Sequence, residues 1–276
     1  MGALFLLAAL PAMAADGIYR WTDDNGRPHF GDHPPPGAER LSGGDAEEAS
    51  AGYHAVERIP DGDTIHLADG SEVRLIGINA PEVAQRDEPA EPGGPQARRF
   101  LRALLADERV RLEIGPEATD QYGRTLAHVF LDDGTNVAER LLAAGHAFVT
   151  PRPPNVTTVW PYFTVERRAR SAKRGLWNRP HYAVRPAAKA RDMRNSFRRL
   201  RGQVATVTPK RKYVYLGFAS GFEAFLRKDR NRAFSEAGKN PEALLGRTMT
   251  VRGWIGMRDG TPRIRLRHPL QVEAVQ

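Results

Sequence analysis

The chain contains no cysteine, which excludes both a disulfide framework and a metal site built from thiolates. Beyond the first fifteen residues, no apolar run is long enough to cross a membrane as a helix. Disulfide-free chains occur in every compartment, so the absence of cysteine does not decide where the protein is located. The 276 residues suffice for two or three domains with at least one packed core.

Charge is spread unevenly along the chain. Residues 1–55 carry a net charge of −5 and residues 56–178 carry −2, whereas residues 179–276 carry 22 Lys/Arg against seven Asp/Glu, or +15. An arginine-rich composition explains the preference for Arg over Lys but not this asymmetry. The last hundred residues are therefore expected to face a polyanionic partner.

The N-terminal residues are typical of a secretory signal peptide. Residues 1–14 are apolar and end in Ala12-Met13-Ala14, a small-residue cleavage signal, which predicts export to the periplasm or the medium. No positive charge precedes Asp16, so an upstream start, an atypical peptide and a buried N-terminal helix all stay open.

Residues 15–40 predict a small β module. Tyr19 and Trp21 alternate on one short strand, Asp24-Asn25-Gly26 turns the chain, and His29-Phe30 begins the return strand. The pattern YxWxDxxGxxxFxDxPP resembles a small envelope-protein module of unknown function. Two strands bury little apolar surface, so the module is expected to pack against another surface that the sequence does not identify. Residues 41–54 predict a flexible acidic linker.

The stretch from 58 to 82, RIPDGDTIHLADGSEVRLIGINAPE, carries most of the chemistry. Asp69-Gly70 is a tight-turn dipeptide between alternating runs, which predicts a β-hairpin with a return strand over Val73–Ile78. Such a hairpin brings Asp63 close to Arg74, Asn79 and Glu82. Carboxylates bind hard cations and a guanidinium binds phosphate, so the cluster suits both. The alternative is an ordinary turn with solvated side chains.

The rest of residues 55–178 alternates strands and helices. Helices are expected over 95–106, from a cap at Asn136 to a stop at Gly145, and over about 161–174, with strands over 110–114 and 126–131. The loops 83–94 and 151–159 separate them. This order predicts a mainly β, α+β domain: a five-stranded barrel of the oligonucleotide-binding (OB) type with packed helices.

Residues 179–195 are predicted to be a linker with some helical tendency, and residues 196–276 a basic, OB-like second barrel. Strands 204–207, 213–218, 222–226, 249–255 and 264–270 surround a helical patch in that segment. The alternative is an irregular basic β appendage. Aromatic side chains here either stack on bases or form the barrel core: Tyr213, Tyr215, Phe218, Phe222 and Trp254.

Five motifs in order resemble the staphylococcal nuclease (thermonuclease) family. They are Asp61-Gly62-Asp63-Thr64, Arg74 to Glu82, Gly94-Pro95-Gln96-Ala97, Thr119 to Arg124, and Gly175-Leu176-Trp177. The resemblance implies an OB-fold nuclease that uses Ca²⁺. It assigns metal binding to Asp63, Asn79 and the Ala80 carbonyl, phosphate binding to Arg74 and Arg124, water activation to Glu82, substrate contact to Tyr122 and Gln121, and support of the metal site to Asp61 and Thr64.

The chain departs from the family pattern at three places. Asn79 stands where the family has a second metal-binding aspartate, which removes one negative charge and leaves another divalent cation open as the cofactor. Gln121 replaces a lysine, and Pro151 and Pro153 occupy the loop that carries the family's base-stacking tyrosines. Metal affinity and grip on a free nucleotide are therefore expected to be weaker.

Three functions fit these observations. The first is an exported, calcium-dependent nuclease acting on single-stranded or unstructured DNA or RNA. The second is a catalytically weak nucleic-acid-binding protein whose metal site has degenerated at Asn79, and the third is an envelope protein whose barrels bind protein or glycan. Glu82 favours the enzyme, because a carboxylate beside an incoming phosphate only repels it unless it takes part in the chemistry.

Overall fold

A computed structural model describes residues 19–22, 28–31, 36–37, 39–40, 52–84 and 89–276. The predicted signal peptide and most of the acidic linker lie outside these residues. The chain divides into two compact units, residues 1–54 and 55–276. No helix in the described part of the chain is both long and apolar enough to cross a membrane.

The first unit contains a small antiparallel sheet in the order β2-β1-β3. Its strands are β1 (Tyr19–Thr22), β2 (Pro28–Gly31) and β3 (Glu39–Arg40). β1 pairs with β2 so that Trp21 lies opposite His29, which confirms the predicted pair of strands. The turn predicted at residues 24–26 lies outside the described residues.

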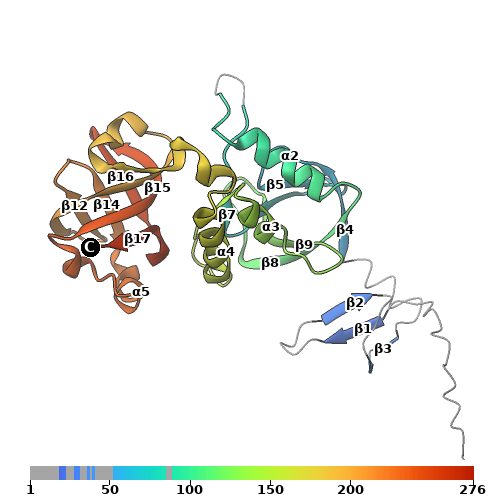
Figure 1. Cartoon of the computed structure of the whole chain (residues 1–276). Helices are drawn as coiled ribbons and strands as arrows, with labels where there is room; N and C mark the ends of the chain where they lie inside the picture. The colour runs from blue at the N-terminus through green and yellow to red at the C-terminus, as the bar shows by residue number, and fades with distance from the viewer. Residues whose placement is uncertain (1–18, 23–27, 32–35, 38, 41–51, 85–88) are drawn as a thin grey trace, which may run out of the picture. The chain divides into compact units, whose positions relative to one another are not determined.

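The second unit begins with a closed five-stranded barrel in the order β4-β5-β6-β9-β8 (Figure 1). The strands are β4 (Tyr53–Arg58), β5 (Thr64–Leu67), β6 (Glu72–Leu75), β8 (Arg109–Thr119) and β9 (Thr125–Phe130). β6 and β9 run parallel, while the other described ladders are antiparallel. Alternating apolar residues of these strands, including Ile65, Leu67, Val73 and Val129, fill the barrel, as period-two patterning requires.

The hairpin that carries the chemistry differs from its predicted form in one respect. β5 and β6 pair around the Asp69-Gly70 turn as expected, but the return strand ends at Leu75 rather than Ile78. Gly77 has φ +80°, and a Cβ there would lie 3.1 Å from the Tyr162 ring. The chain therefore bends, and β7 (Ile78–Asn79) pairs with β10 (Phe148–Val149) instead of extending β6.

Three helices pack on the first barrel: α2 (Gly94–Leu104), α3 (Val137–Ala144) and α4 (Val159–Ser171). Pro95 lies in the first turn of α2, where its missing N–H costs nothing. The Asn136 side chain accepts a hydrogen bond from the Glu139 N–H, and Gly145 ends α3 at φ +72°, as the sequence predicts. A 3₁₀ turn, η1 (Gly175–Asn178), follows α4.

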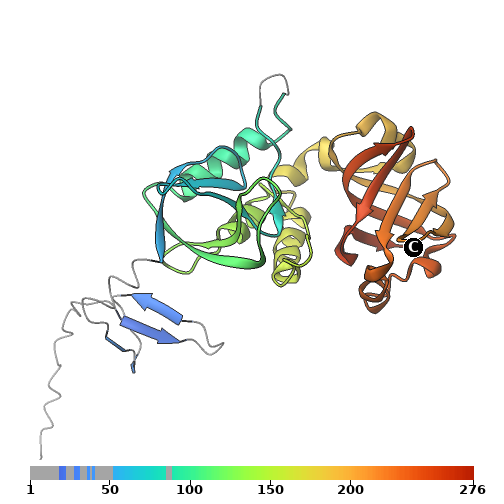
Figure 2. The ribbon, with the colours of Figure 1, turned by 180° about the vertical axis from the view of Figure 1, so that it is seen from behind.

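A second barrel follows, formed by β12, β13, β14, β16 and β15 and closed by pairing of β15 with β12 (Figure 2). Its strand order and its parallel pair, β14 with β16, repeat those of the first barrel. This confirms the second OB-like fold. The strands are β12 (Phe197–Pro209), β13 (Tyr213–Phe218), β14 (Glu223–Arg227), β15 (Thr248–Arg258) and β16 (Thr261–Leu266), with β17 (Val272–Val275) added beside β15.

Short elements complete this half of the unit. Residues 179–195 contain η2 (Pro180–Tyr182), β11 (Val184–Pro186) and η3 (Ala187–Met193), and β11 pairs parallel to β12. Between β14 and β15 lie η4 (Lys228–Arg230), α5 (Asn231–Glu236) and η5 (Pro241–Leu244), with η6 (Pro269–Gln271) before β17. Buried Tyr182, Ala187 and Ala190 anchor the 179–195 segment.

A buried ion pair joins the two barrels. Arg252 of β15 is 1% exposed and places Nη2 2.8 Å from Oε2 of Glu166 on α4, which is fully buried. The same two side chains bind β10, because Glu166 accepts from the Val149 N–H at 2.6 Å and Arg252 donates to the Val149 carbonyl at 2.6 Å. Next to them the rings of Phe148 and Phe197 stack, with their centroids 3.8 Å apart. The second barrel thus supports β10, and through it the strand that carries Asn79.

Candidate active site

The β5–β6 hairpin brings Asp63 and Arg74 into direct contact. Thr64 lies opposite Arg74 in the ladder, so Asp63, the residue before it, reaches the same end of the hairpin. Arg74 Nη2 lies 2.8 Å from Asp63 Oδ2, and both side chains are largely buried. A carboxylate and a guanidinium from opposite strands thus meet at one end of the hairpin, as the sequence predicts.

The bend at Gly77 adds Asn79 and Ala80 to this pair. The Ala80 N–H donates to Asp63 Oδ2 at 2.6 Å, and Arg74 Nη2 donates to Asn79 Oδ1 at 3.0 Å. The amide nitrogen of Asn79 in turn donates to the Ala80 carbonyl at 2.7 Å. Asp63, Arg74, Asn79 and Ala80 therefore form one continuous hydrogen-bonded network.

Close packing of small residues holds these loops together. A Cβ on Gly62 would lie 2.6 Å from the methyl groups of both Ala80 and Ala97, so the turn before β5, the loop after β7 and α2 meet without room for a side chain. A Cβ on Gly94 would lie 2.1 Å from the carbonyl oxygen of Glu82. The close approach of these segments therefore explains why the motifs that contain Gly62, Ala80 and Gly94 have small residues at these positions.

Glu82 follows this network on the loop after β7. Its backbone N–H donates to Glu91 Oε2 at 3.1 Å, and its carbonyl accepts from the Glu91 N–H at 2.9 Å, which fixes the loop. Burial, followed by repulsion from Asp61, raises the pKa of the Glu82 carboxyl above its ordinary value. A carboxylate with a raised pKa is the better proton acceptor at neutral pH.

Arg124 approaches from the start of β9. Its Nε and Nη2 bind Asp120 Oδ2 at 2.8 and 2.7 Å, a forked contact that fixes the guanidinium plane. Its Nη1 lies 3.5 Å from Thr64 Oγ1, which links it to the Asp63 end of the hairpin. Tyr122 lies under the guanidinium at 5.4 Å and is 74% exposed, which excludes a core role; Gln121 is also exposed.

The carboxylates of the site repel one another. Burial raises the pKa of Asp63 to about 7, Arg74 opposes that rise, and the charges on Asp61 and Glu82 add to it. The Asp61 carboxylate accepts the Asp63 N–H at 3.0 Å, so the two acids share one turn. A cation placed among these oxygens would relieve the repulsion.

The donor set therefore fits a hard divalent cation. Carboxylate oxygens of Asp63 with the Ala80 carbonyl and the Asn79 amide oxygen are the ligand types that Ca²⁺ prefers. Among the residues that the structure describes, no three His, Cys, Asp or Glu side chains are grouped as a ready-made metal cage. Since Asn79 Oδ1 and the Ala80 carbonyl already accept internal hydrogen bonds, a bound cation has to compete for them.

Cation binding is expected to depend on pH. The pKa of Asp63 in the folded chain, about 7, exceeds its ordinary value of 3.8, so the folded state binds a proton on Asp63 more tightly than the unfolded state does. Protonated Asp63 therefore stabilises the fold below pH 4, and this stabilisation is lost as the pH rises from about 4 to 7. A cation requires the ionised form, so its apparent affinity should be about tenfold lower at pH 6 than at pH 8. Calcium titration by calorimetry measures this; an equal affinity at both pH values in the native chain would contradict it, and Glu72→Gln, which removes an exposed carboxylate of the same hairpin, should keep the native pH dependence.

One residue near the site was not predicted. Arg152, in the loop after β10, has a pKa below its ordinary value because burial and the charges of Arg74 and Arg124 disfavour another cation there. It lies in the loop that the sequence identified only through its prolines. A basic residue between two prolines was the available signal, but its position relative to Arg74 depends on how β10 meets β7.

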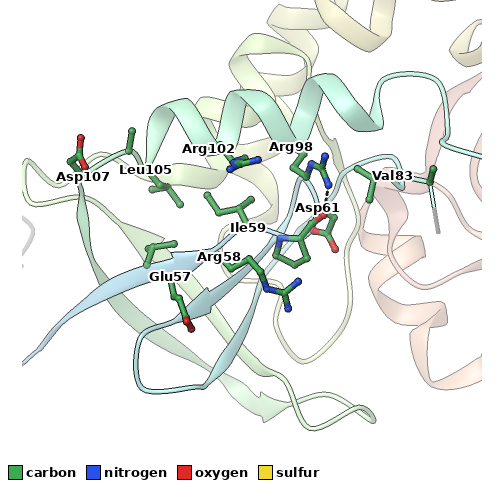
Figure 3. A pocket seen from close by; sticks show the side chains of 13 residues that line it. Glu57, Arg58, Ile59, Asp61, Val83, Arg98, Arg102, Leu105 and Asp107 are labelled. Atoms are coloured by element: carbon green, nitrogen blue, oxygen red, sulfur yellow. Dashed lines mark hydrogen bonds between the residues drawn. The ribbon is translucent and has the colours of Figure 1, made fainter. Parts of the chain in front are cut away.

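A cavity of about 770 Å³ lies between β4 and α2, with Asp61 in its lining (Figure 3). Arg58, Arg98 and Arg102 line it, and Arg98 donates to the Pro60 carbonyl at 3.5 Å. Three carboxylates, Glu57, Asp61 and Asp107, line the same cavity, so its positive and negative charges are equal in number.

The structure thus joins most of the predicted site residues. Asp63, Arg74, Asn79 and Ala80 bind one another directly, and Thr64 connects them to Arg124. Glu82 is close enough for the charges of Arg74 and Arg124 to lower the pKa of its carboxyl, which opposes the effect of burial. The exposed side chains of Tyr122 and Gln121 lie at the rim of the site. The roles assigned to these residues stay predictions.

Comparison with known proteins gives two family matches. The Staphylococcal nuclease homologue (SNase) family matches residues 72–179, and a Domain of unknown function (DUF4124) matches residues 5–43. The second barrel lies beyond both matches.

Several relatives are similar over the same half of the chain. The Thermonuclease of Staphylococcus intermedius is 38% identical over 130 residues, 46% of this chain and 76% of its own length. The Thermonuclease of Staphylococcus hyicus is 33% identical over 128 residues, 45% of this chain and 75% of its own. An uncharacterized endonuclease of Escherichia coli O157:H7 is 34% identical over 126 residues, 45% of this chain and 75% of its own.

Proposed function

Because the chain belongs to the staphylococcal nuclease homologue family and is a hydrolase of the nuclease class, we propose that it cleaves phosphodiester bonds of single-stranded or unstructured DNA and RNA with the help of a divalent cation, Ca²⁺ in the first place. The observation that carries this proposal is the network of Asp63, Arg74, Asn79 and Ala80, with Arg124 and Glu82 around it. Binding alone would not need a basic carboxylate beside two phosphate-binding arginines.

Arg74 and Arg124 bind the scissile phosphate in this mechanism. Each guanidinium is already oriented by a carboxylate, Arg74 by Asp63 and Arg124 by Asp120, so little reorganisation is needed when negative charge builds on the phosphate oxygens. Donors directed at developing charge contribute about 3 kcal/mol each in comparable sites. Tyr122 lies beside Arg124 at the rim, where it can contact the bound strand.

Glu82 orients the attacking water and accepts its proton. Its raised pKa makes it a stronger base, and the loop is fixed by backbone contacts with Glu91 and by the close approach of Gly94. Asp63, with Asn79 and the Ala80 carbonyl, would hold the cation, which when bound supplies positive charge next to the phosphate. Asp61 supports the turn by accepting the Asp63 N–H, and Thr64 donates to Asp63 Oδ1 at 3.3 Å.

Export and domain organisation are part of the proposal. We place a signal peptide at 1–14, the small module at 15–40, a linker at 41–54, the nuclease domain at 55–178 and the second barrel at 196–276, with 179–195 between them. The apolar stretch ending in Ala12-Met13-Ala14 supports export to the periplasm or the medium. The match of residues 5–43 to a domain of unknown function supports a separate N-terminal module.

Digestion of labelled single-stranded DNA and RNA tests the proposed activity. The chain starting at Ala15 is incubated with each strand in Ca²⁺, Mg²⁺, Mn²⁺ or EDTA, and products are resolved on denaturing gels. We expect cleavage that requires a divalent cation and is fastest with Ca²⁺. Absence of cleavage with every cation would contradict the proposal.

The second candidate, a weak nuclease that mainly binds nucleic acid, is favoured by the hydrogen bonds of Asn79. Its amide bridges Arg74 and the Ala80 carbonyl, so the chain has an internal bridge where a carboxylate would coordinate a cation.

Asn79→Asp distinguishes the two candidates. The added carboxylate supplies one more charged ligand, so we expect calcium affinity to rise at least several-fold, measured by calorimetry. If the native chain is an efficient nuclease, turnover at saturating Ca²⁺ should change little. If the native chain cleaves nothing and the variant does, the native protein is a binder. Asn136→Asp, the same exchange at the α3 cap, is the control and should leave calcium affinity unchanged.

A further inference from the structure

The second barrel carries a row of aromatic side chains on the outside of its sheet. Tyr213 and Tyr215 of β13 and Phe225 of β14 alternate with buried residues and are half-buried themselves. The rings of Tyr215 and Phe225 stack with centroids 5.6 Å apart, and Tyr213 meets Phe225 edge-on at the same distance. By contrast Phe218 and Phe222, also considered as base-stacking residues, are core residues of the barrel.

Basic side chains surround these rings. The Arg263 guanidinium lies 4.9 Å from the centre of the Phe225 ring, and Lys210 Nζ lies 5.0 Å from that of Tyr215. Arg263 and Arg265 of β16 lie beside β14, since Phe225 is the ladder partner of Arg265. In OB folds the face of the second and third strands is where oligonucleotides bind, and β13 and β14 hold those positions here.

A groove connects this face with the active site. It has a volume of about 290 Å³, and its lining includes Asn79, Arg152, Phe225, Trp254, Arg265 and Arg267. Within this lining, Asn79 binds Arg74, and Phe225 belongs to the aromatic row. Trp254 is 45% exposed, so it offers a further apolar surface along the groove.

Of the five arginines that line the groove, four form no ion pair with a carboxylate of residues 52–84 and 89–276, while the fifth, Arg252, is paired with Glu166. Within residues 52–84 and 89–276, Arg152, Arg263, Arg265 and Arg267 form no ion pair, whereas Arg199 and Arg252 of the same barrel are paired. Burial lowers the pKa of Arg152 and of Arg267, and neighbouring cations lower both further: Arg74 and Arg124 act on Arg152, and Arg265 and Arg152 act on Arg267. A continuous row of cations thus runs from the catalytic arginines to the second barrel, and a phosphate backbone would neutralise it.

We propose that the outer face of β13, β14 and β16 binds single-stranded nucleic acid, with bases stacked on Tyr215 and Phe225 and phosphates following Arg263, Arg265, Arg267 and Arg152 to the active site. This assigns the second barrel a binding site for the same strand that the first barrel cleaves, and in that respect the inference rests on the proposed function. Aromatic rings of the second barrel would thereby take the role of the base-stacking tyrosines that the 151–159 loop lacks.

Binding of a fluorescein-labelled oligothymidylate of about 20 nucleotides, measured by anisotropy in EDTA, tests the site without cleavage. Arg263→Ala with Arg265→Ala should weaken binding roughly tenfold or more and lower the salt slope by about 1.4, because each phosphate contact to a single strand contributes about 0.7. Tyr215→Leu should weaken binding about tenfold with an unchanged slope, since it removes stacking but no charge.

Arg232→Ala is the matched control, because Arg232 is an exposed arginine of α5 in the same barrel, paired with Glu236, and does not line the groove. It should leave both affinity and slope close to native. Thermal melting of each variant confirms that the barrel is folded, as expected for substitutions on its outer face. Native affinity in the double variant and in Tyr215→Leu would overturn the proposal, as would equal affinity for a duplex of the same length.

Cleavage provides the second readout. The ratio of kcat/KM for the long strand to that for bis(p-nitrophenyl) phosphate, which is too short to reach the second barrel, should fall at least tenfold in the double variant. An unchanged ratio would contradict the proposal. If instead the native chain hydrolyses neither compound, the proposed nuclease function fails, whereas the binding experiment in EDTA still decides whether the second-barrel site exists.

Discussion

Glu82→Gln should lower the rate of strand cleavage by about 10²- to 10⁴-fold, because the amide can still hold a water molecule but cannot accept its proton. The loss should appear in kcat rather than in KM, since Glu82 repels the phosphate in the ground state and contributes nothing to its binding. Single-strand affinity, measured in EDTA, should therefore be equal to native or slightly higher. Initial rates on a labelled single strand at saturating Ca²⁺ give the effect.

Glu72→Gln is the matched control for this change. Glu72 lies on β6 of the same hairpin, about half exposed, and pairs with His66 at 3.4 Å, away from the Asp63 network. The same loss of one carboxylate there should leave the rate near native. A Glu82→Gln chain that cleaves at the native rate would remove Glu82 from the mechanism and leave water activation to another group.

Arg252→Met should destabilise residues 55–276 by about 3–5 kcal/mol. The substitution leaves the Glu166 carboxylate buried without its counter-ion, and uncompensated buried charges carry that penalty. It also removes the donor to the Val149 carbonyl, so β10 loses support and the β7 strand with Asn79 becomes less firmly held. Urea unfolding followed by fluorescence measures the first effect, and a fall in cleavage rate measures the second.

The compensating variant makes this prediction specific. Adding Glu166→Gln to Arg252→Met removes the stranded charge, while the Gln oxygen can still accept the Val149 N–H. Most of the lost stability should therefore return. If the urea midpoint of Arg252→Met alone equals that of the native chain, the ion pair does not hold the two barrels together. Arg232→Ala, which breaks an exposed pair, should cost at most about 0.5 kcal/mol.

Local signals in the sequence determined much of the first barrel. Asp69-Gly70 set the hairpin turn, and with it the meeting of Asp63 and Arg74, because the turn fixes the register of the two strands. Pro95, Asn136 and Gly145 marked helix ends through backbone requirements that act within a few residues. The alternation of the second-barrel strands also separates outward Tyr215 from inward Phe218, and it places Phe225 rather than Phe222 on the outer face.

Tertiary structure alone decided the features that depend on which surfaces meet. The bend at Gly77 requires a glycine, because φ is +80° and an added Cβ would lie 3.1 Å from the Tyr162 ring, and it is this bend that turns Asn79 toward β10 rather than along β6. The pairing of Arg252 with Glu166 links residues 86 positions apart, and an arginine in an arginine-rich segment gives no local sign of its partner. The groove from Asn79 to Phe225 has the same origin: its cations are visible in the sequence, but the row they form exists only where the two barrels pack.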